Sequence, residues 1–317
     1  MKQRQIEAGK EIQQETGRTF HIATRLLPER IRHPTYVLYG FFRIADEVVD
    51  SAETLPPAQQ EEKLDRLRAE ALGDTESDDP VMSAFAELKA EYGITDEEIE
   101  VFVDAMQSDI AVDRYETYED LEAYMRGSAS AVGVMMTDIM QPDAHEQALP
   151  HAVALGKAFQ MSNFLRDVRE DIVQRDRIYL PLQTLRDHDV TEQQIENLEF
   201  SEGFAAAMQA ELRRTERLYR EGVAGIKFLP EDCQFAVLLS AVLYAEHHRL
   251  IRKQDYDVLS AEPELGLARS LYLAARTRWH WLWNSDPEAV FRRVSAVPYG
   301  DTTEGRGRGH GEGLPAR

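Results

Sequence analysis

An arginine and two aspartates recur at helical spacing in the first third of the chain. Arg43, Asp46 and Asp50 lie three and four residues apart in the segment 36–50, which reads YVLYGFFRIADEVVD. Residues three or four apart share one face of a helix, so these side chains can reach one another. Apolar residues cover most of this helix, which predicts that it is buried. Because buried carboxylates are costly without a cation, the aspartates indicate a bound positive charge.

A second segment carries a longer row of oxygen-bearing side chains. Gln160, Asn163, Asp167 and Asp171 recur at intervals of three, four and four residues, with Arg166 beside the third. Hard divalent cations prefer oxygen ligands, and Mg²⁺ commonly combines one or two carboxylates with waters and substrate phosphate oxygens. Two such helices facing each other in a bundle would therefore hold Mg²⁺ against a diphosphate.

The chemistry that these motifs predict is ionisation of an allylic diphosphate. Metal ions and arginines would stabilise the leaving group, while an apolar cavity with aromatic walls would shelter the carbocation from water. A single helix with an Asp-x-x-x-Asp motif usually carries it on a solvated surface. Two such motifs in apolar surroundings favour a metal-binding site. Carboxylate di-iron bundles need Glu-x-x-His pairs, which neither motif contains. The adjacent histidines His247 and His248 predict an ordinary polar helix face.

The elements that must position these motifs are helices. Apolar residues follow helical spacing along nearly the whole chain, and Pro or Gly residues separate the segments. Strand alternation never extends beyond a few residues, and the sequence has no glycine-rich phosphate loop. We predict one all-α domain over residues 1–300 and a disordered, Gly-rich tail over 301–317. Further helices are expected at about residues 58–72, 81–92, 96–114, 117–139, 151–174, 201–222, 231–254 and 265–284.

Composition limits the partners of this chain. Its 317 residues include 57 Asp and Glu against 36 Lys and Arg, a net charge of −21 at pH 7. Such a surface repels nucleic acid and anionic lipid unless basic residues cluster locally, and the sequence has no cluster strong enough, so we expect no nucleic-acid partner. Only seven of the basic residues are Lys. Excess carboxylate with few lysines leads to the hypothesis that the protein is halophilic.

The sequence also indicates where the protein works. A single cysteine, Cys233, excludes an intramolecular disulfide framework and any metal site built from several cysteines. The N-terminal segment has no apolar region typical of a signal peptide, and no stretch approaches 18 uncharged apolar residues. We therefore expect a cytoplasmic protein.

The motifs and their surroundings resemble the squalene/phytoene synthase family of trans-isoprenyl diphosphate synthases, and most closely the archaeal and bacterial phytoene synthases. The resemblance runs from about residue 16 to 257. Its most specific landmark is QMSNFLRDVREDIVQRDRIYLP at 160–181, and the others are Thr19-Phe20, Leu26-Leu27-Pro28, YGFFRIADEVVD at 39–50 and YEDLEAYMRGSASAVG at 118–133. It implies an isoprenoid synthase helical bundle with a central active-site cavity.

The resemblance also implies roles for individual residues. The residues implied to hold Mg²⁺, or Mn²⁺ in its place, are Asp46, Asp50, Asn163, Asp167 and Asp171. The four aspartates and Tyr124 are implied to be catalytic. The implied substrate-binding residues are the arginines Arg43 and Arg166, the polar Gln160, the aromatic Phe20, Tyr39 and Tyr244, and the small Ala129 and Gly133, where the prenyl chain would pass close to the helix.

Two stretches depart from the family pattern. The late helix reads YAEHHR at 244–249 where relatives carry Tyr-Arg-x-Ile-Leu, and after YDVL at 256–259 the sequence SAEPE replaces a short basic run. Arg249, Arg252 and Arg269 are candidates to compensate for the missing basic residues. The alternative is a weaker second diphosphate site.

The activity implied by the resemblance is phytoene synthesis, the first committed step of carotenoid biosynthesis. Two geranylgeranyl diphosphates condense head to head through a cyclopropyl (prephytoene) diphosphate, and no NADPH is expected. One alternative is a squalene or dehydrosqualene synthase that uses farnesyl diphosphate. Another is a non-catalytic helical assembly protein, which would have no reason to keep both aspartate motifs. Since substrate and product are lipids, transient association at the membrane periphery is expected, through a patch that the sequence does not locate.

Overall fold

A computed structural model describes residues 24–50 and 55–299 of the chain, so Phe20 and the predicted tail at 301–317 lie outside the described residues. The described part is helical, with no strand beyond one isolated bridge between Arg114 and Ile178. The all-α prediction is confirmed. The helices are α3 (Glu29–Asp50), α4 (Pro57–Leu72), α5 (Pro80–Tyr92), α6 (Asp96–Ser108), α7 (Tyr118–Met125), η1 (Arg126–Ala131), α8 (Val132–Met140), α9 (His145–Arg166), α10 (Val168–Arg175), α11 (Leu182–Arg186), α12 (Glu192–Glu196), α13 (Glu202–Ala224), η2 (Ile226–Phe228), α14 (Glu231–Lys253), α15 (Leu267–Trp283) and α16 (Pro287–Val294).

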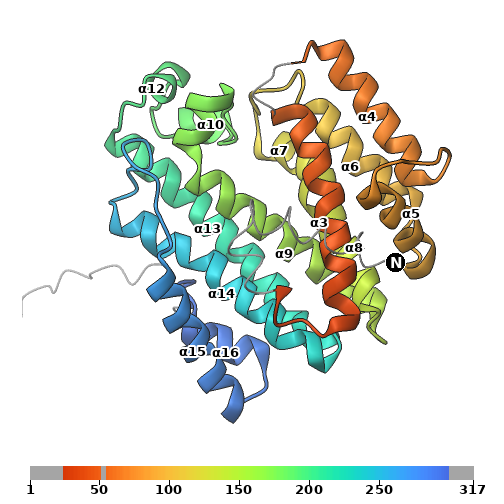
Figure 1. Ribbon diagram of the computed structural model, residues 1–317. Coiled ribbons are helices and arrows are strands. Elements are labelled where there is room, and N and C mark those ends of the chain that lie inside the picture. The colour runs from red at the N-terminus through yellow and green to blue at the C-terminus, as the bar shows by residue number, and fades with distance from the viewer. Residues whose placement is uncertain (1–23, 51–54, 300–317) are drawn as a thin grey trace, which may run out of the picture.

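Helix α9 is the centre of the bundle. It contacts α13, α8, η1 and α14, and Figure 1 shows it crossing the middle of the molecule, with α13 and α14 on one side and α3 and α8 on the other. Its apolar residues are spread around the whole circumference, as expected for a helix with neighbours on every side. The fold therefore gives α9 one face toward α3, the helix that carries the other aspartate motif.

Glycines allow α9 to approach its neighbours closely. A methyl group added to Gly133 of α8 would lie 2.5 Å from the carbonyl oxygen of Ala152, and one added to Gly222 of α13 would lie 2.7 Å from the backbone nitrogen of Leu155. Any larger residue would force these helices apart. The close approach fixes the walls on either side of α9.

The helix predicted at 117–139 contains a π turn. Helices α7 and α8 are joined by η1, a six-residue π-helical segment. Here the chain passes so close to α6 that a methyl group on Gly127 would lie 2.0 Å from the carbonyl oxygen of Val101. A π turn accommodates one extra residue in an otherwise continuous helix, and such turns are frequent at functional sites.

The helix predicted at 151–174 begins earlier, at His145, and is broken at Asp167. That residue has φ −97° and ψ 13°, so α9 ends before it and α10 begins after it. Two backbone bonds nevertheless persist across the break, from Asp167 N to Asn163 O and from Asp171 N to Asp167 O, both 2.8 Å. The helix predicted at 96–114 also ends early, at Ser108.

The prediction of a polar surface at His247 and His248 is wrong, because both side chains are buried. His248 Nε2 lies 3.1 Å from Ser162 Oγ, which is also 2.8 Å from the Tyr219 hydroxyl. Burial lowers the pKa of His247 to about 4 and lowers that of His248 as well, so both rings are neutral at pH 7. Helix α14 is covered on both sides, which leaves this pair no solvent-facing side.

Candidate active site

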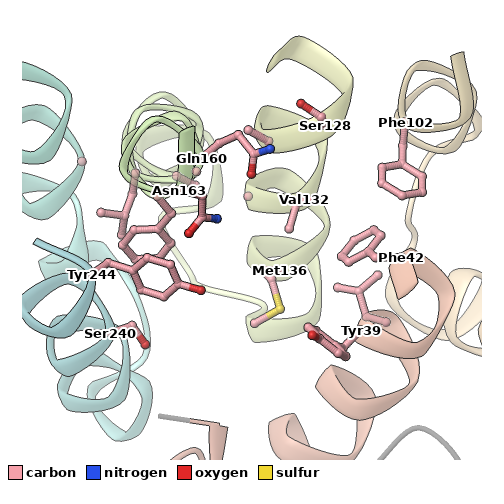
Figure 2. Close-up of a pocket in the computed structure, with 18 of the residues that line it drawn as sticks. Tyr39, Phe42, Phe102, Ser128, Val132, Met136, Gln160, Asn163, Ser240 and Tyr244 are labelled. Carbon is pink, nitrogen blue, oxygen red and sulfur yellow. The ribbon is translucent and has the colours of Figure 1, made fainter. Parts of the chain in front are cut away.

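A cavity of about 900 Å³ lies between α3, α8, α9 and α14. Figure 2 shows side chains from these helices around the same space, among them Tyr39, Val132, Met136, Gln160, Asn163 and Tyr244. Twelve of the residues singled out from the sequence line this cavity: Tyr39, Arg43, Asp46, Tyr124, Ala129, Gly133, Gln160, Asn163, Arg166, Asp167, Asp171 and Tyr244. Asp50 is the last residue of α3, but its side chain lies outside the described part, as does Phe20.

The polar and apolar linings are separated along the cavity. Asp46 lies near the C-terminal end of α3 and Asp167 follows the end of α9, and both helices end toward α10 in Figure 1. Earlier residues of α9, such as Ala152 and Leu155, also line the cavity. At a rise of 1.5 Å per residue, Ala152 lies roughly 22 Å along the helix from Asp167. The cavity therefore has a charged end and a long apolar end.

The described aspartate of the first motif, Asp46, is partly open to solvent. Arg43 Nη1 lies 4.0 Å from Asp46 Oδ2, and Arg43 Nε lies 3.6 Å from Glu47 Oε1. Both distances exceed a normal hydrogen bond, and the Asp46 side chain is 41% exposed. An exposed ion pair at this distance contributes little stability.

The second motif is held more tightly. Arg166 Nε and Nη2 each donate to one carboxylate oxygen of Asp167 at 2.5 Å, a two-pronged arrangement typical of arginine. Burial would lower the pKa of the Arg166 guanidinium, but the Asp167 carboxylate outweighs it, and the pKa lies above the ordinary value. Next along the chain, Arg175 donates to Glu170 and Asp171 at 3.3 Å. Arginines therefore form ion pairs with the carboxylates of the second motif.

A hydrogen bond between Tyr124 and Asp109 was not predicted. The Tyr124 hydroxyl donates to Asp109 Oδ2 at 2.9 Å, and its ring belongs to an aromatic cluster with Tyr115, Phe164 and Tyr179. Burial, assisted by the charge of Asp109, raises the pKa of Tyr124 well above 10. The hydroxyl therefore remains protonated and serves as a hydrogen-bond donor at neutral pH.

Four other charged residues at this end were also missed as site residues. Asp109, Glu170, Arg175 and Arg177 all line the cavity, and Arg177 donates from Nη2 to the Asp109 carbonyl oxygen at 2.7 Å. Glu170 and the two arginines stand in the segment 160–181, so closeness to the aspartates could have identified them. Nothing in the sequence connects Asp109 to that segment.

The apolar end is built from small and aromatic residues. The ring of Tyr244 stacks on Phe159 with centroids 4.5 Å apart, and Ala129 and Gly133 line the facing wall. Burial raises the pKa of Tyr244 to about 12, so this hydroxyl is neutral as well. Such walls suit a hydrocarbon chain and would keep water away from a reactive cation.

The three arginines considered as replacements for the missing basic run do not line the cavity. Arg249 and Arg269 both bind Glu246, the latter from Nε at 2.9 Å, and Arg252 binds Glu216. The predicted compensation is therefore not found at these positions. The arginines that do line the charged end, beyond the predicted two, are Arg175 and Arg177.

The donor set at the charged end suits a hard divalent cation. Asp46 and Asn163 face the cavity from opposite walls, with Asp167 and Asp171 beside them. Among the described side chains, which leave out that of Asp50, no three His, Cys, Asp or Glu residues are close enough to hold a metal ion by themselves. Mg²⁺ usually completes its shell with waters and substrate phosphates, so the residues fit an ion that binds together with a diphosphate.

Comparisons with known proteins agree with this arrangement. The squalene/phytoene synthase family matches residues 13–273. The chain is 32% identical over 275 residues to the 15-cis-phytoene synthase of Synechococcus elongatus, covering 80% of this chain and 86% of that one, and 31% identical over 281 residues to a phytoene synthase of Rhodobacter capsulatus, covering 86% and 81%.

Solved structures share the fold. A dehydrosqualene synthase crystallised with a ligand superimposes with a TM-score of 0.80 at 24% identity, covering 89% of this chain and 98% of that chain. A squalene synthase from Alicyclobacillus acidocaldarius gives 0.69 at 23% identity, covering 80% and 94%. With its helical bundle, aspartates from both motifs on one cavity and its match over residues 13–273, this chain belongs to the squalene/phytoene synthase family of prenyltransferase-type enzymes.

Proposed function

We propose that this enzyme is a phytoene synthase that condenses two geranylgeranyl diphosphates head to head. The observation that carries the proposal is the single cavity with a charged end and a long apolar end. The curated relatives with about 30% identity, which are named phytoene synthases, support the choice of substrate. A volume of about 900 Å³ lies at the upper end of the range for small-molecule sites, as two long chains require.

The charged end would bind the diphosphates. Mg²⁺ held by Asp46, Asn163, Asp167 and Asp171, together with Asp50, would supply positive charge that stabilises the departing diphosphate. Arg43 and Arg166 stand beside these carboxylates and would donate to diphosphate oxygens. The protein holds the metal ligands and the arginines at the charged end of the cavity. Each prenyl chain then extends toward the apolar end.

The apolar end would control the carbocation. Loss of the first diphosphate breaks its bond to the allylic carbon, and the double bond of the second molecule forms a carbon–carbon bond there. Release of a proton from the resulting cation closes the three-membered ring and gives a cyclopropylcarbinyl diphosphate. Loss of the second diphosphate, rearrangement and release of one proton then give phytoene without a reductant. Tyr39 and Tyr244 would stabilise the positive charge through their ring faces, while Tyr124 and Tyr244 remain protonated and do not act as bases at pH 7.

The decisive experiment identifies the hydrocarbon product. Purified enzyme is incubated with Mg²⁺ and geranylgeranyl diphosphate, and separately with farnesyl diphosphate with and without NADPH. Phytoene from the first mixture supports the proposal. Squalene or dehydrosqualene formed only from farnesyl diphosphate would assign the enzyme to the shorter substrate. A folded protein that forms no product from either would favour an assembly role, and a chelated sample is the negative control.

We also propose that the acidic surface is an adaptation to concentrated salt. The net charge of −21 disfavours the compact state at low ionic strength, and salt screens this repulsion. Folding and activity are expected to rise with KCl concentration. Full stability in the absence of salt would contradict the proposal.

A further inference from the structure

Helix α15 carries apolar side chains on the side that faces solvent. Its exposed positions are Leu267, Ala268, Leu271, Tyr272, Ala275, Arg278, Trp279, Leu282 and Trp283. These positions recur at helical spacing along the whole helix, and eight of the nine are apolar or aromatic. Trp283 is 77% exposed and Leu267 is 68% exposed. The solvent side of a surface helix normally carries polar residues, whereas this side of α15 is mostly apolar. These nine exposed positions are called the α15 face.

The α15 face is not needed to hold the helix in place. The opposite side of α15 packs against α14 and α16 through the buried residues Leu273 and Thr277. Trp281 lies beside Phe235 of α14, with ring centroids 6.0 Å apart. The hydroxyl on the packed side is satisfied locally, since Thr277 Oγ1 donates to Leu273 O at 2.7 Å. The fold is therefore complete without any partner on the exposed side.

The region around α15 is positively charged, whereas the chain as a whole is strongly negative. Residues 265–285 contain no Asp or Glu, although acids make up 57 of the 317 residues. The segment instead contains Arg269, Arg276 and Arg278, which give it a formal charge of +3, and α16 adds Arg292 and Arg293 in its last turn. The α15 face is thus an apolar surface with a basic border on a protein of charge −21.

We propose that the α15 face docks on the surface of a membrane that contains anionic lipids. Exposed Leu and Trp side chains at the headgroup boundary, bordered by arginines, are typical of helices that lie in the plane of a bilayer. A second copy of the chain is a poorer occupant, since a two-fold contact would bring Arg276 and Arg278 of both copies to one interface, where residues 265–285 supply no acid to pair with them. The face does not cross the bilayer: none of the helices within 24–50 and 55–299 has the length and hydropathy of a membrane span.

The docked surface would lie directly behind the cavity. Helix α14 contacts α15 on one side and lines the cavity with Ala236, Val237, Ser240 and Tyr244 on the other. Two helices, α15 and α14, would therefore separate the membrane from the cavity. The functional benefit of docking rests on the proposed function, because a phytoene synthase takes up a lipid substrate and releases a lipid product. Docking itself requires no substrate.

The tryptophans allow docking to be measured directly. All three tryptophans of the chain, at 279, 281 and 283, lie on α15. Intrinsic emission therefore reports on this helix alone. Adding vesicles of phosphatidylcholine and phosphatidylglycerol is expected to shift the emission to the blue, and lipids brominated near the headgroup should quench it. Unchanged emission, together with failure of the protein to float with these vesicles, would overturn the proposal.

Variants separate the apolar and electrostatic contributions. The triple variant Leu271→Gln, Trp279→Gln, Trp283→Gln should weaken vesicle binding about tenfold or more, while Arg276→Gln and Arg278→Gln should each weaken it about fivefold and reduce the preference for phosphatidylglycerol. Phe200→Gln, which changes an exposed aromatic residue before α13, is the matched control and should bind as the parent does. Equal flotation of the triple variant, or equal binding to neutral vesicles, would overturn the proposal.

Light scattering tests the competing occupant. If the parent protein is a dimer that the triple variant dissociates, the face belongs to a second copy and the proposal is wrong. Turnover of detergent-dispersed substrate should be equal in the parent and in the triple variant. Because flotation uses no substrate, loss of docking and failure of the proposed activity give separate results.

Discussion

Asp46 of the first motif and Asp167 of the second line one cavity, yet their surroundings differ. Asp46 is 41% exposed on an uninterrupted helix and lies 4.0 Å from Arg43. Asp167 is 20% exposed and follows the end of α9. Its carboxylate accepts hydrogen bonds from two nitrogens of Arg166. The comparison indicates that the second motif presents a carboxylate held by short hydrogen bonds to an arginine, whereas the first presents a carboxylate that is more open to solvent.

The difference originates in what lies behind each helix. Ser162, one residue before Asn163, is bonded to Tyr219 and lies beside His248, so the second motif is backed by a buried polar network. Helix α3 instead presents Phe41, which is buried in the main hydrophobic cluster and stacks on Phe85. Hydrophobic contacts hold a helix in position without orienting a particular polar group, whereas hydrogen bonds do both.

The largest effect is expected when the second motif loses its charge. Asp167→Asn keeps the size of the side chain but removes the negative charge that Arg166 and a cation require. We expect kcat/KM with geranylgeranyl diphosphate to fall about 10³-fold, with the helical signal in circular dichroism unchanged. Activity within tenfold of the parent would show that the cation is held elsewhere.

The more exposed first motif should tolerate the equivalent change better. Asp46→Asn is expected to lower kcat/KM about 10²-fold, and raising the Mg²⁺ concentration should recover part of the loss, because the remaining ligands can rearrange. A titration of activity against Mg²⁺ for both asparagine variants makes the comparison. Equal losses that no metal concentration relieves would remove the distinction between the motifs.

The arginines test the same contrast on a smaller scale. Arg166→Lys replaces a two-pronged donor with a point charge and should cost about tenfold in kcat/KM. Arg43→Lys, at a residue that lies 4.0 Å from Asp46 in a partly exposed pair, should cost less than about threefold. Arg66→Lys, in a surface pair with Glu70, serves as the control for the substitution itself. A larger loss at Arg43 than at Arg166 would reverse the assignment.

The smallest effect concerns stability and the network near the second motif. His247 is buried with its pKa lowered to about 4, so below its unfolded pKa of 6.5 the unfolded chain binds the proton more readily. Stability is therefore full above pH 6.5 and falls toward pH 4, by about 2 kcal/mol between pH 6.5 and 5. Urea unfolding at several pH values should show this loss, and His247→Gln should remove its share of it. A His247→Gln variant that keeps the full pH dependence of the parent would place the titrating group elsewhere.

Sequence reasoning found the groups whose partners are close in the chain. Arg43 with Asp46, and Arg166 with Asp167, follow from helical spacing, and apolar neighbours indicated that both motifs face inward. It missed the bond from Tyr124 to Asp109, because no spacing connects a residue on α7 with the end of α6. It also placed His247 and His248 on a surface, because a helix covered on both sides has no distinct polar stripe.

Helix breaks were equally hard to predict. The interruption at Asp167 contains neither Gly nor Pro and keeps its flanking backbone bonds, so the sequence carries no local signal for it. The α15 face was overlooked for a different reason. A helix with apolar residues on all sides predicts burial, and only the packing of α14 and α16 reveals which side remains exposed.

The π turn at η1 makes this segment sensitive to the insertion or deletion of a single residue. An α-helix advances about 100° per residue, so deleting one residue from 126–131 would rotate everything before the turn by that angle relative to α8. Tyr124 would then leave the wall that it shares with Ala129 and Gly133, and its bond to Asp109 would break. Loops elsewhere can absorb a change in length, whereas here one residue more or less determines which side chains the substrate meets.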